Sequence, residues 1–264
     1  MNNKALLVGI NKYPDPHNEL RGCINDILDM ETFISEQHTI YNKSSIKKLT
    51  DKQATKKSIV ENLKWLIEGT QAGDQILFHY SGHGAQAPTH HPREEADGND
   101  EIICPYDFDW SNETTLRDKE FAQLFSTIPK GVHFVWVSDS CHAEDLSRDM
   151  INDTNDTSNT VYRYFTGDKK AMNQTTNLSL PTITTPLNGI LLSACESAQL
   201  SADAYIDNRF NGAFTHYLLK NLTKGGLHQP LQQTMQLVNS DLSMNGFDQR
   251  PQFEGNLTPS SFFK

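Results

Sequence analysis

The sequence predicts an α/β fold with a mostly parallel central β-sheet flanked by helices on both faces. Short apolar runs of strand length alternate along the chain with amphipathic stretches. This β-α-β alternation is typical of parallel sheets that are covered by helices on both faces. The chain has 264 residues, of which 36% are hydrophobic, so it can bury a substantial core.

The apolar runs predict the strands. The run from Ala5 to Ile10 is typical of a first buried strand, and the runs from Gln75 to His79 and from Val132 to Val137 have the same character. With three shorter runs, the expected strands are residues 5–10, 45–49, 75–79, 102–104, 132–137 and 189–193.

Apolar residues at helical spacing predict the helices. In residues 55–67, Ile59, Leu63 and Leu66 recur at that spacing, and Thr55 stands in the N-cap position. The expected helices are residues 23–36, 55–67, 116–125, 212–222 and 231–244. Residues 145–186 are rich in Asn, Thr, Ser and Asp and are predicted to form a long, mobile polar loop.

Composition excludes several classes of function. The net charge of −10 argues against a nucleic-acid binder; it suits cationic substrates, or it only aids solubility. No apolar run approaches the ~18 residues of a membrane span, and the N-terminus lacks the pattern of a signal peptide. The four cysteines form no CxxC pair, so we expect no disulfide framework or zinc site and a reducing, cytoplasmic location.

Two of the predicted strands each end close to a candidate catalytic residue. The first is followed by Ser81-Gly82-His83-Gly84, and the second by Ser138-Asp139-Ser140-Cys141-His142. The carboxyl ends of parallel strands share one edge of a sheet, so we expect His83 and Cys141 to face the same cleft. An imidazole beside a thiol makes it a usable nucleophile and later protonates the leaving amine. The pair predicts a cysteine hydrolase.

Backbone N–H groups near these two residues are candidates for the oxyanion hole. The glycines around His83 let the backbone approach a substrate carbonyl group closely. We therefore predict that the N–H groups of Gly84 and Cys141 bind the oxyanion, a contribution of roughly 3–4 kcal/mol per donor.

These motifs resemble those of the metacaspases, a branch of the caspase-like cysteine peptidases. The strongest matches are His79-Tyr80-Ser81-Gly82-His83-Gly84 and Asp139-Ser140-Cys141-His142. Weaker matches extend over almost the whole chain: Gly9-Ile10-Asn11-Lys12-Tyr13, Leu20 to Asp26, Asp97 to Glu101, Pro105-Tyr106-Asp107, Ser193-Ala194-Cys195, Ser201 to Ala204, Gly212 to Thr215 and Gln249 to Gln252.

The resemblance implies a caspase-like fold and a peptidase. It implies one domain over residues 1–264, with a large-subunit-like region to about residue 144, the polar loop over 145–186 and a small-subunit-like region over 187–264. It implies a monomer that acts on protein or peptide substrates through a dyad of His83 (base, then acid) and Cys141 (nucleophile). It also implies an acidic S1 pocket for an Arg or Lys at P1, the residue whose carbonyl group is attacked. The positions that match this pocket are Asp26, Asp139, Ser81 and Cys23.

The chain departs from the family pattern at two places. After the nucleophile, Ala143 and Glu144 replace the usual Ser-Gly. Many metacaspases carry a calcium site, and Asp100 and Asp118 match two of its positions. Arg117 and Arg148 stand at the other two, and calcium tolerates cations poorly. We therefore expect that no cofactor is required and keep calcium as a possible activator.

The basic residues of the polar loop suggest self-processing. An enzyme that cuts after basic residues could cut its own chain at Arg148, Arg163, Lys169 or Lys170. Otherwise the segment is a passive linker. Two further alternatives remain: a catalytically weak adaptor that uses the fold for binding, and a peptidase of the same fold that cuts after Asp or Asn.

Overall fold

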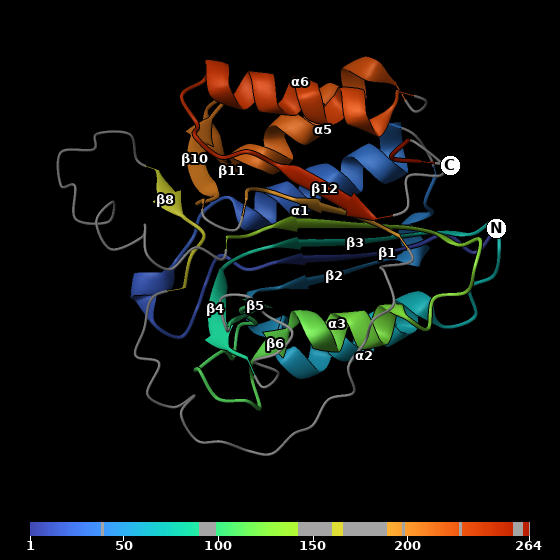
Figure 1. Ribbon diagram of the computed structural model, residues 1–264, viewed down its shortest axis with the longest axis horizontal. Helices are drawn as coiled ribbons and strands as arrows, with labels where there is room; N and C mark the ends of the chain where they lie inside the picture. The colour runs from blue at the N-terminus through green and yellow to red at the C-terminus, as the bar shows by residue number, and fades with distance from the viewer. Residues whose placement is uncertain are drawn as a thin grey trace.

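A computed structural model describes residues 1–37, 40–89, 99–141, 160–165, 189–196, 199–226, 229–255 and 261–263. The chain folds around a six-stranded sheet between two layers of helices (Figure 1). In spatial order the strands are β12 (Gln252–Gly255), β9 (Ile190–Ser193), β7 (His133–Asp139), β3 (Gln75–Ser81), β1 (Lys4–Gly9) and β2 (Ile46–Thr50). All neighbours pair in parallel except β12, which is antiparallel to β9. This confirms the predicted fold class.

The central strands β1, β3 and β7 are buried on both faces of the sheet. Helices α1 (Cys23–Thr32), α5 (Ala213–Gly225) and α6 (Leu231–Met244) lie on one side of it, and α2 (Lys56–Ile67) and α3 (Asp118–Phe125) on the other. Successive side chains of β1 point to opposite faces. Leu6 and Val8 join the core that includes α2 and α3, whereas Ala5 and Leu7 join the core of α1, α5 and α6. Burial on both faces explains why the strands read as continuous apolar runs.

Helix α2 begins as the sequence predicts. The side chain of Thr55 accepts a hydrogen bond from the N–H of Ser58, as expected of an N-cap.

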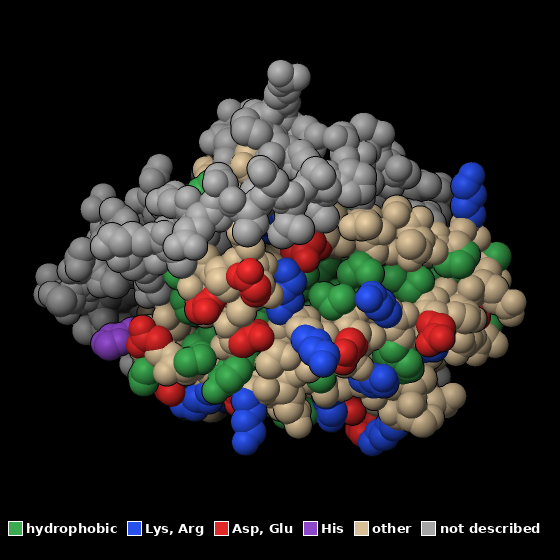
Figure 2. All heavy atoms as spheres, turned by 90° about the horizontal axis from the view of Figure 1, so that it is seen from below, with side chains coloured by type: hydrophobic (Ala, Val, Ile, Leu, Met, Phe, Trp, Pro, Cys, Tyr) green, Lys and Arg blue, Asp and Glu red, His purple; other side chains and the backbone are tan. Residues whose placement is uncertain are grey.

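Figure 2 shows the molecule from the side of α2 and α3, where acidic and basic side chains are interspersed over the described part of the surface. An ion pair joins the two helices, with Lys56 Nζ 2.9 Å from Glu120 Oε1.

Two small antiparallel sheets lie outside the main one. The first consists of β4 (Gly84–Pro88), β5 (Asn99–Ile103) and β6 (Leu116–Arg117). The second consists of β8 (Val161–Tyr162), β10 (Ala202–Ile206) and β11 (Arg209–Gly212). Both lie at the end of the main sheet where β3 and β7 terminate, as Figure 1 shows.

Two sequence predictions were wrong in part. Residues 116 and 117 form β6 rather than the first turn of α3, because they pair with β5. The polar loop predicted over 145–186 contains β8, followed by Arg163, Tyr164 and Phe165, all of which are buried. The rest of that segment lies outside the described residues, and the division of the chain into three regions stays a prediction. Within the described ranges, no helix combines the length and apolar character needed to cross a membrane.

Candidate active site

The ends of two central strands bring the predicted catalytic residues to one place. In the pairing of β3 with β7, Ser81 lies opposite Asp139. His83 follows shortly after the end of β3, and Cys141 follows shortly after the end of β7. Because the two strands are parallel neighbours, both residues leave the sheet at the same edge. Both are buried.

The two predicted oxyanion donors converge on a single atom. The backbone N–H of Gly84 lies 3.0 Å from the carbonyl oxygen of Arg163, and the N–H of Cys141 lies 3.4 Å from that same oxygen. This is the arrangement in which a carbonyl group would be polarised for attack. The carbonyl group bound there is that of Arg163, a residue of the same chain.

The ring of His83 is held in a defined orientation. Its Nε2 lies 2.8 Å from the carbonyl oxygen of Asn18. A carbonyl oxygen can only accept, so the neutral ring carries its proton on Nε2 and leaves the lone pair on Nδ1. The hydroxyl groups of Tyr13 and Tyr80 fix the backbone of His83, at 3.0 Å from its N and 2.7 Å from its O. Nδ1 is buried and has no hydrogen-bond partner, so it is free to take a proton.

Burial keeps both members of the predicted dyad neutral. It lowers the pKa of His83 to about 4, against the opposing effect of the Asn18 carbonyl group. It raises the pKa of the Cys141 thiol to about 12, opposed in part by backbone hydrogen bonding and by the charge of Arg163. The site as it stands therefore holds a thiol and a neutral imidazole rather than an ion pair.

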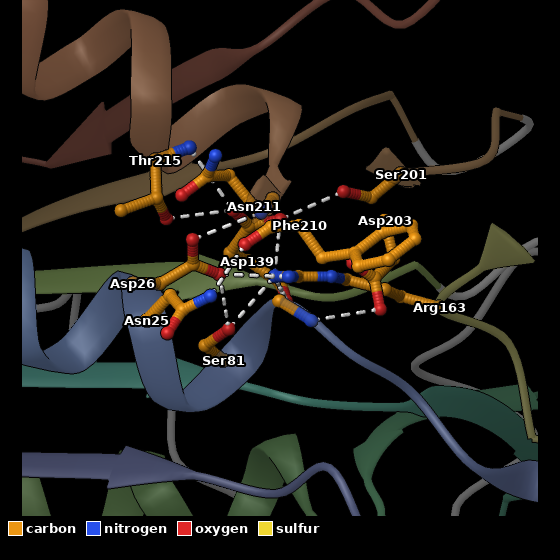
Figure 3. Close-up of polar contacts among 12 residues, drawn as sticks. Asn25, Asp26, Ser81, Asp139, Arg163, Ser201, Asp203, Phe210, Asn211 and Thr215 are labelled. Atoms are coloured by element: carbon orange, nitrogen blue, oxygen red, sulfur yellow. Dashed lines mark hydrogen bonds and ion pairs between the residues drawn. The ribbon is translucent and has the colours of Figure 1, made fainter. Parts of the chain in front are cut away.

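The side chain of Arg163 lies in an acidic pocket beside these residues (Figure 3). Its Nη2 is 2.7 Å from Asp26 Oδ2, and its Nη1 is 3.0 Å from Asp139 Oδ1. Nη1 also donates to Ser81 Oγ at 2.8 Å. Cys23 is buried at the start of α1; burial raises the pKa of its thiol, and the charge of Arg163 opposes that effect. The structure thus gathers the four predicted pocket residues around one guanidinium group.

Neighbouring groups fix the two carboxylates. Asp26 accepts a hydrogen bond from the N–H of Gly212 at 2.9 Å. Asp139 accepts from Ser201 Oγ at 2.7 Å and from the N–H and Oγ1 of Thr215 at 3.0 and 2.6 Å. Burial raises the pKa of Asp26 to about 6, the charge of Arg163 opposes this, and the charge of Asp139 adds to it. The charge of Arg163 therefore favours the ionised form of Asp26.

Sequence reasoning assigned no role to three residues of this pocket. Ser201 and Thr215 hold Asp139, as described above. Asp203 is buried on β10 and accepts from the N–H groups of Arg21 and Gly22, at 2.6 and 3.1 Å, which ties β10 to the start of α1. All three lie in short motifs that matched the family pattern, which is the signal that could have identified them.

The segment around Arg163 crosses the site as an extended strand. Val161 and Tyr162 pair with β10 in antiparallel fashion. The N–H of Arg163 donates to the carbonyl oxygen of Ser201 at 2.9 Å, and the N–H of Phe165 donates to that of Gly84 at 3.0 Å. Backbone hydrogen bonds thus hold the chain on both sides of the Arg163 carbonyl group.

Comparison with known proteins identifies the family. A family model described as "Metacaspase, peptidase C14 domain" matches residues 3–177. The chain belongs to the metacaspase, peptidase C14 family. This confirms the resemblance inferred from the motifs, and the family is one of cysteine-type endopeptidases.

Fungal metacaspases are similar over most of the chain. Metacaspase-1B of Aspergillus oryzae is 31% identical over 286 residues, which cover 94% of this chain and 66% of that protein. Metacaspase-1 of Coccidioides immitis is 32% identical over 287 residues, which cover 94% of this chain and 60% of that protein. The chain therefore spans no more than about two thirds of the length of these relatives.

Solved structures show the same fold. A protein from Geobacter sulfurreducens superposes with a TM-score of 0.70 at 23% identity, covering 99% of this chain and 97% of that one. Caspase-1 from Spodoptera frugiperda superposes with a TM-score of 0.62 at 11% identity, covering 96% and 86%. The caspase-like arrangement predicted from the metacaspase motifs is confirmed.

The acidic residues that match a metacaspase calcium site are already paired. Asp100 is buried, with Oδ2 2.7 Å from Arg117 Nη1 and Oδ1 2.8 Å from Lys119 Nζ. Burial raises the pKa of Asp100, but hydrogen bonds from Lys119, Thr89 and Arg117 outweigh it and lower that pKa. Asp118 Oδ1 accepts from the backbone N–H of Lys119 at 2.7 Å. Calcium needs about six to eight oxygen ligands. Of these two carboxylates only that of Asp100 is buried, and it is already held by the cations of Arg117 and Lys119. In this arrangement the residues do not fit calcium.

Several residues named above lie outside the described ranges. They include Ala143, Glu144 and Arg148, as well as Lys169 and Lys170. Across the described part of the chain, no group of three or more His, Cys, Asp or Glu side chains is placed to hold a metal ion.

The neutral state of the site predicts slow modification of Cys141. With a pKa of about 12, the thiol is protonated at pH 7. We expect iodoacetamide to alkylate it at least about 100-fold more slowly than a free cysteine, with a rate that rises about tenfold per pH unit up to pH 12. Arg163→Ala removes the cation that anchors the covering segment, residues 161–165, and should raise the rate. Peptide mapping of the intact chain measures alkylation at each cysteine; equally fast labelling of wild type and variant would contradict the prediction.

Proposed function

We propose that the chain is a cysteine endopeptidase that cuts after Arg or Lys and that cuts its own chain after Arg163. The single observation that carries this proposal is the placement of Arg163. Its side chain lies between Asp26 and Asp139, and its carbonyl oxygen lies at the N–H groups of Gly84 and Cys141. A substrate residue at P1 must present its side chain and its carbonyl group in these two places together.

The proposed reaction uses His83 as base and then acid, and Cys141 as nucleophile. His83 Nδ1 takes the thiol proton as Cys141 Sγ attacks the carbonyl carbon, and the developing oxyanion is stabilised by the two N–H groups. The C–N bond then breaks, and His83 gives its proton to the leaving amine, which in self-cleavage is the nitrogen of Tyr164. Water attacks the resulting thioester, again with His83 as base, and releases the new carboxylate and the thiol.

The acidic pocket supports the proposed preference for a basic P1 residue. Asp26 and Asp139 supply two carboxylates in a desolvated space, and a guanidinium group can bond to both at once. An acidic P1 side chain would place a third negative charge there. The same reasoning disfavours the alternative of cutting after Asp. We also expect the peptidase to act as a monomer in a reducing compartment, where Cys141 stays a thiol.

A peptide panel tests the specificity. We expect fluorogenic peptides with Arg or Lys at P1 to be cut at least about 100-fold faster than the matching Asp and Asn peptides, since only a cation satisfies both carboxylates. Asp26→Asn should lower kcat/KM for the Arg peptide by about 10-fold or more, whereas Asp248→Asn, at an exposed position, serves as a matched control. Faster hydrolysis after Asp or Asn would overturn the pocket assignment, and no hydrolysis of any peptide would support an adaptor.

Self-cleavage after Arg163 is tested by intact mass. We expect active protein to yield fragments 1–163 and 164–264, because Arg163 is the basic residue held in the pocket. Arg163→Lys should still be cut and Arg163→Gln should not, while Arg148→Gln, a change at another basic residue of the loop, should be cut like wild type. Cys141→Ala controls for contaminating peptidases. Identical masses for wild type and Cys141→Ala would reject the proposal.

Calcium independence is the third expectation. We propose that no metal is needed, because Arg117 and Lys119 already neutralise Asp100. Turnover of the Arg peptide should agree within about twofold between buffers with added calcium and with chelator. Activation of tenfold or more by calcium would show that the ion binds elsewhere or displaces the two cations.

A further inference from the structure

A cluster of aromatic side chains surrounds Phe165, the second residue after the Arg163 carbonyl group. The ring of Phe165 lies 4.9 Å from that of Phe108, 5.5 Å from Tyr13, 5.7 Å from His83 and 6.1 Å from Trp110, measured between ring centroids. All four contacts are edge-to-face, the favoured geometry for aromatic pairs. Phe165 is only 6% exposed.

The backbone brings Phe165 to this cluster. Its N–H donates to the carbonyl oxygen of Gly84 at 3.0 Å, and Tyr164 forms a parallel bridge with Gly84. The N–H of that same Gly84 donates to the Arg163 oxygen. These contacts involve no side chain of the bound segment. Any peptide that presents its P1 carbonyl group to Gly84 in an extended conformation will therefore place its second following residue at the cluster.

The other rings are held by contacts of their own. Phe108 and Trp110 pack against each other at 4.9 Å, in a turn that Asp109 stabilises through Ser111 and Thr114. Trp110 has a φ of 67°, a left-handed conformation that is costly for a bulky residue and that marks a position fixed by its surroundings. Tyr13 donates from its hydroxyl group to the carbonyl oxygen of Cys104 at 3.3 Å. These contacts hold the rings of Tyr13, Phe108 and Trp110 in place without help from Phe165.

We infer that Tyr13, Phe108 and Trp110 form a substrate subsite that takes an aromatic side chain at the second position after the scissile bond. Phe165 occupies it in the closed chain, and a substrate aromatic residue occupies it once that segment has left. The preferred substrate is a protein or peptide with a basic residue, any residue and then Phe, Tyr or Trp, as in Arg163-Tyr164-Phe165. The inference rests on the proposed function, because it uses the bond after Arg163 as the site of cleavage.

Internally quenched peptides that continue past the scissile bond test the subsite. Peptides with a common Arg at P1 would differ only at the second following residue, which is Phe, Tyr, Leu, Ala or Asp. We expect kcat/KM for the Phe peptide to exceed that for the Ala peptide by at least about tenfold, because burial of an aromatic ring is favourable. Trp110→Ala and Phe108→Leu should each reduce this ratio to about two or less. Tyr205→Ala, which removes a half-exposed ring on β10, should keep it.

The Phe-to-Ala ratio is measured within one preparation, so it does not depend on how much of a variant folds. If both variants fail to fold, the wild-type peptide series alone decides whether an aromatic residue is preferred. An Arg-aminocoumarin substrate, which has no residue at the second following position, reports on the proposed function separately. Turnover of that substrate together with equal kcat/KM values across the peptide series would overturn the subsite, but it would leave the proposed peptidase function standing. No turnover of any substrate would overturn both.

Discussion

The buried guanidinium group of Arg163 is the contact on which the whole site depends. It joins the first turn of α1, through Asp26, to the ends of β3 and β7, through Ser81 and Asp139. Without a cation, two desolvated carboxylates would face each other, which is costly because buried charges must be paired. Under the proposed function, closure of the site and recognition of a basic substrate are the same physical interaction, made in one case by Arg163 of the chain and in the other by the substrate.

If the pocket binds a basic substrate as proposed, the covering segment competes with that substrate. A tethered segment acts at an effective concentration in the millimolar range for short linkers, so a free peptide displaces it poorly. The hydrogen bonds from Ser201 and Gly84 to the strand add to its hold. While the segment stays in place, burial also keeps Cys141 protonated and His83 neutral. A cut after Arg163 would leave that segment attached to the chain on one side only. This would weaken both its hold on the site and the burial that keeps Cys141 protonated and His83 neutral.

The sequence predicted β1, β2, β3, β7 and β9 of the central sheet, because its inner strands are apolar on both faces, and it predicted the helices from their regular spacing. It missed the edge strand β12, whose side chains are mostly exposed. The residues at the sheet edge were assigned from motifs that end these strands. The second small sheet was missed, since β10 and β11 contain Asp203 and Asn211 and read as loop. A distant segment, Arg21 and Gly22, supplies the partners of buried Asp203, whereas the side-chain amide of Asn211 donates within the hairpin to the carbonyl oxygens of Ile206 and Arg209. The sequence named Arg163 as one of four candidate cleavage sites, but burial of its side chain in the acidic pocket was not predicted, because the partners of that side chain come from distant segments. Its neighbours Val161, Tyr162 and Phe165 form an apolar run, but the polar residues around it dominate the composition.

The pairing of Ser81 with Asp139 in adjacent strands has a consequence for when chemistry can begin. Side chains alternate between the faces of a sheet, so a shift of one residue in this pairing would turn either Ser81 or Asp139 away from the pocket. The pocket also needs α1, β8 and β10, which come from widely separated parts of the chain. A chain in which any one of these segments has not yet docked lacks the pocket. Under the proposed function, a newly made chain therefore cannot use Cys141 to cut itself until the last of these segments is in place.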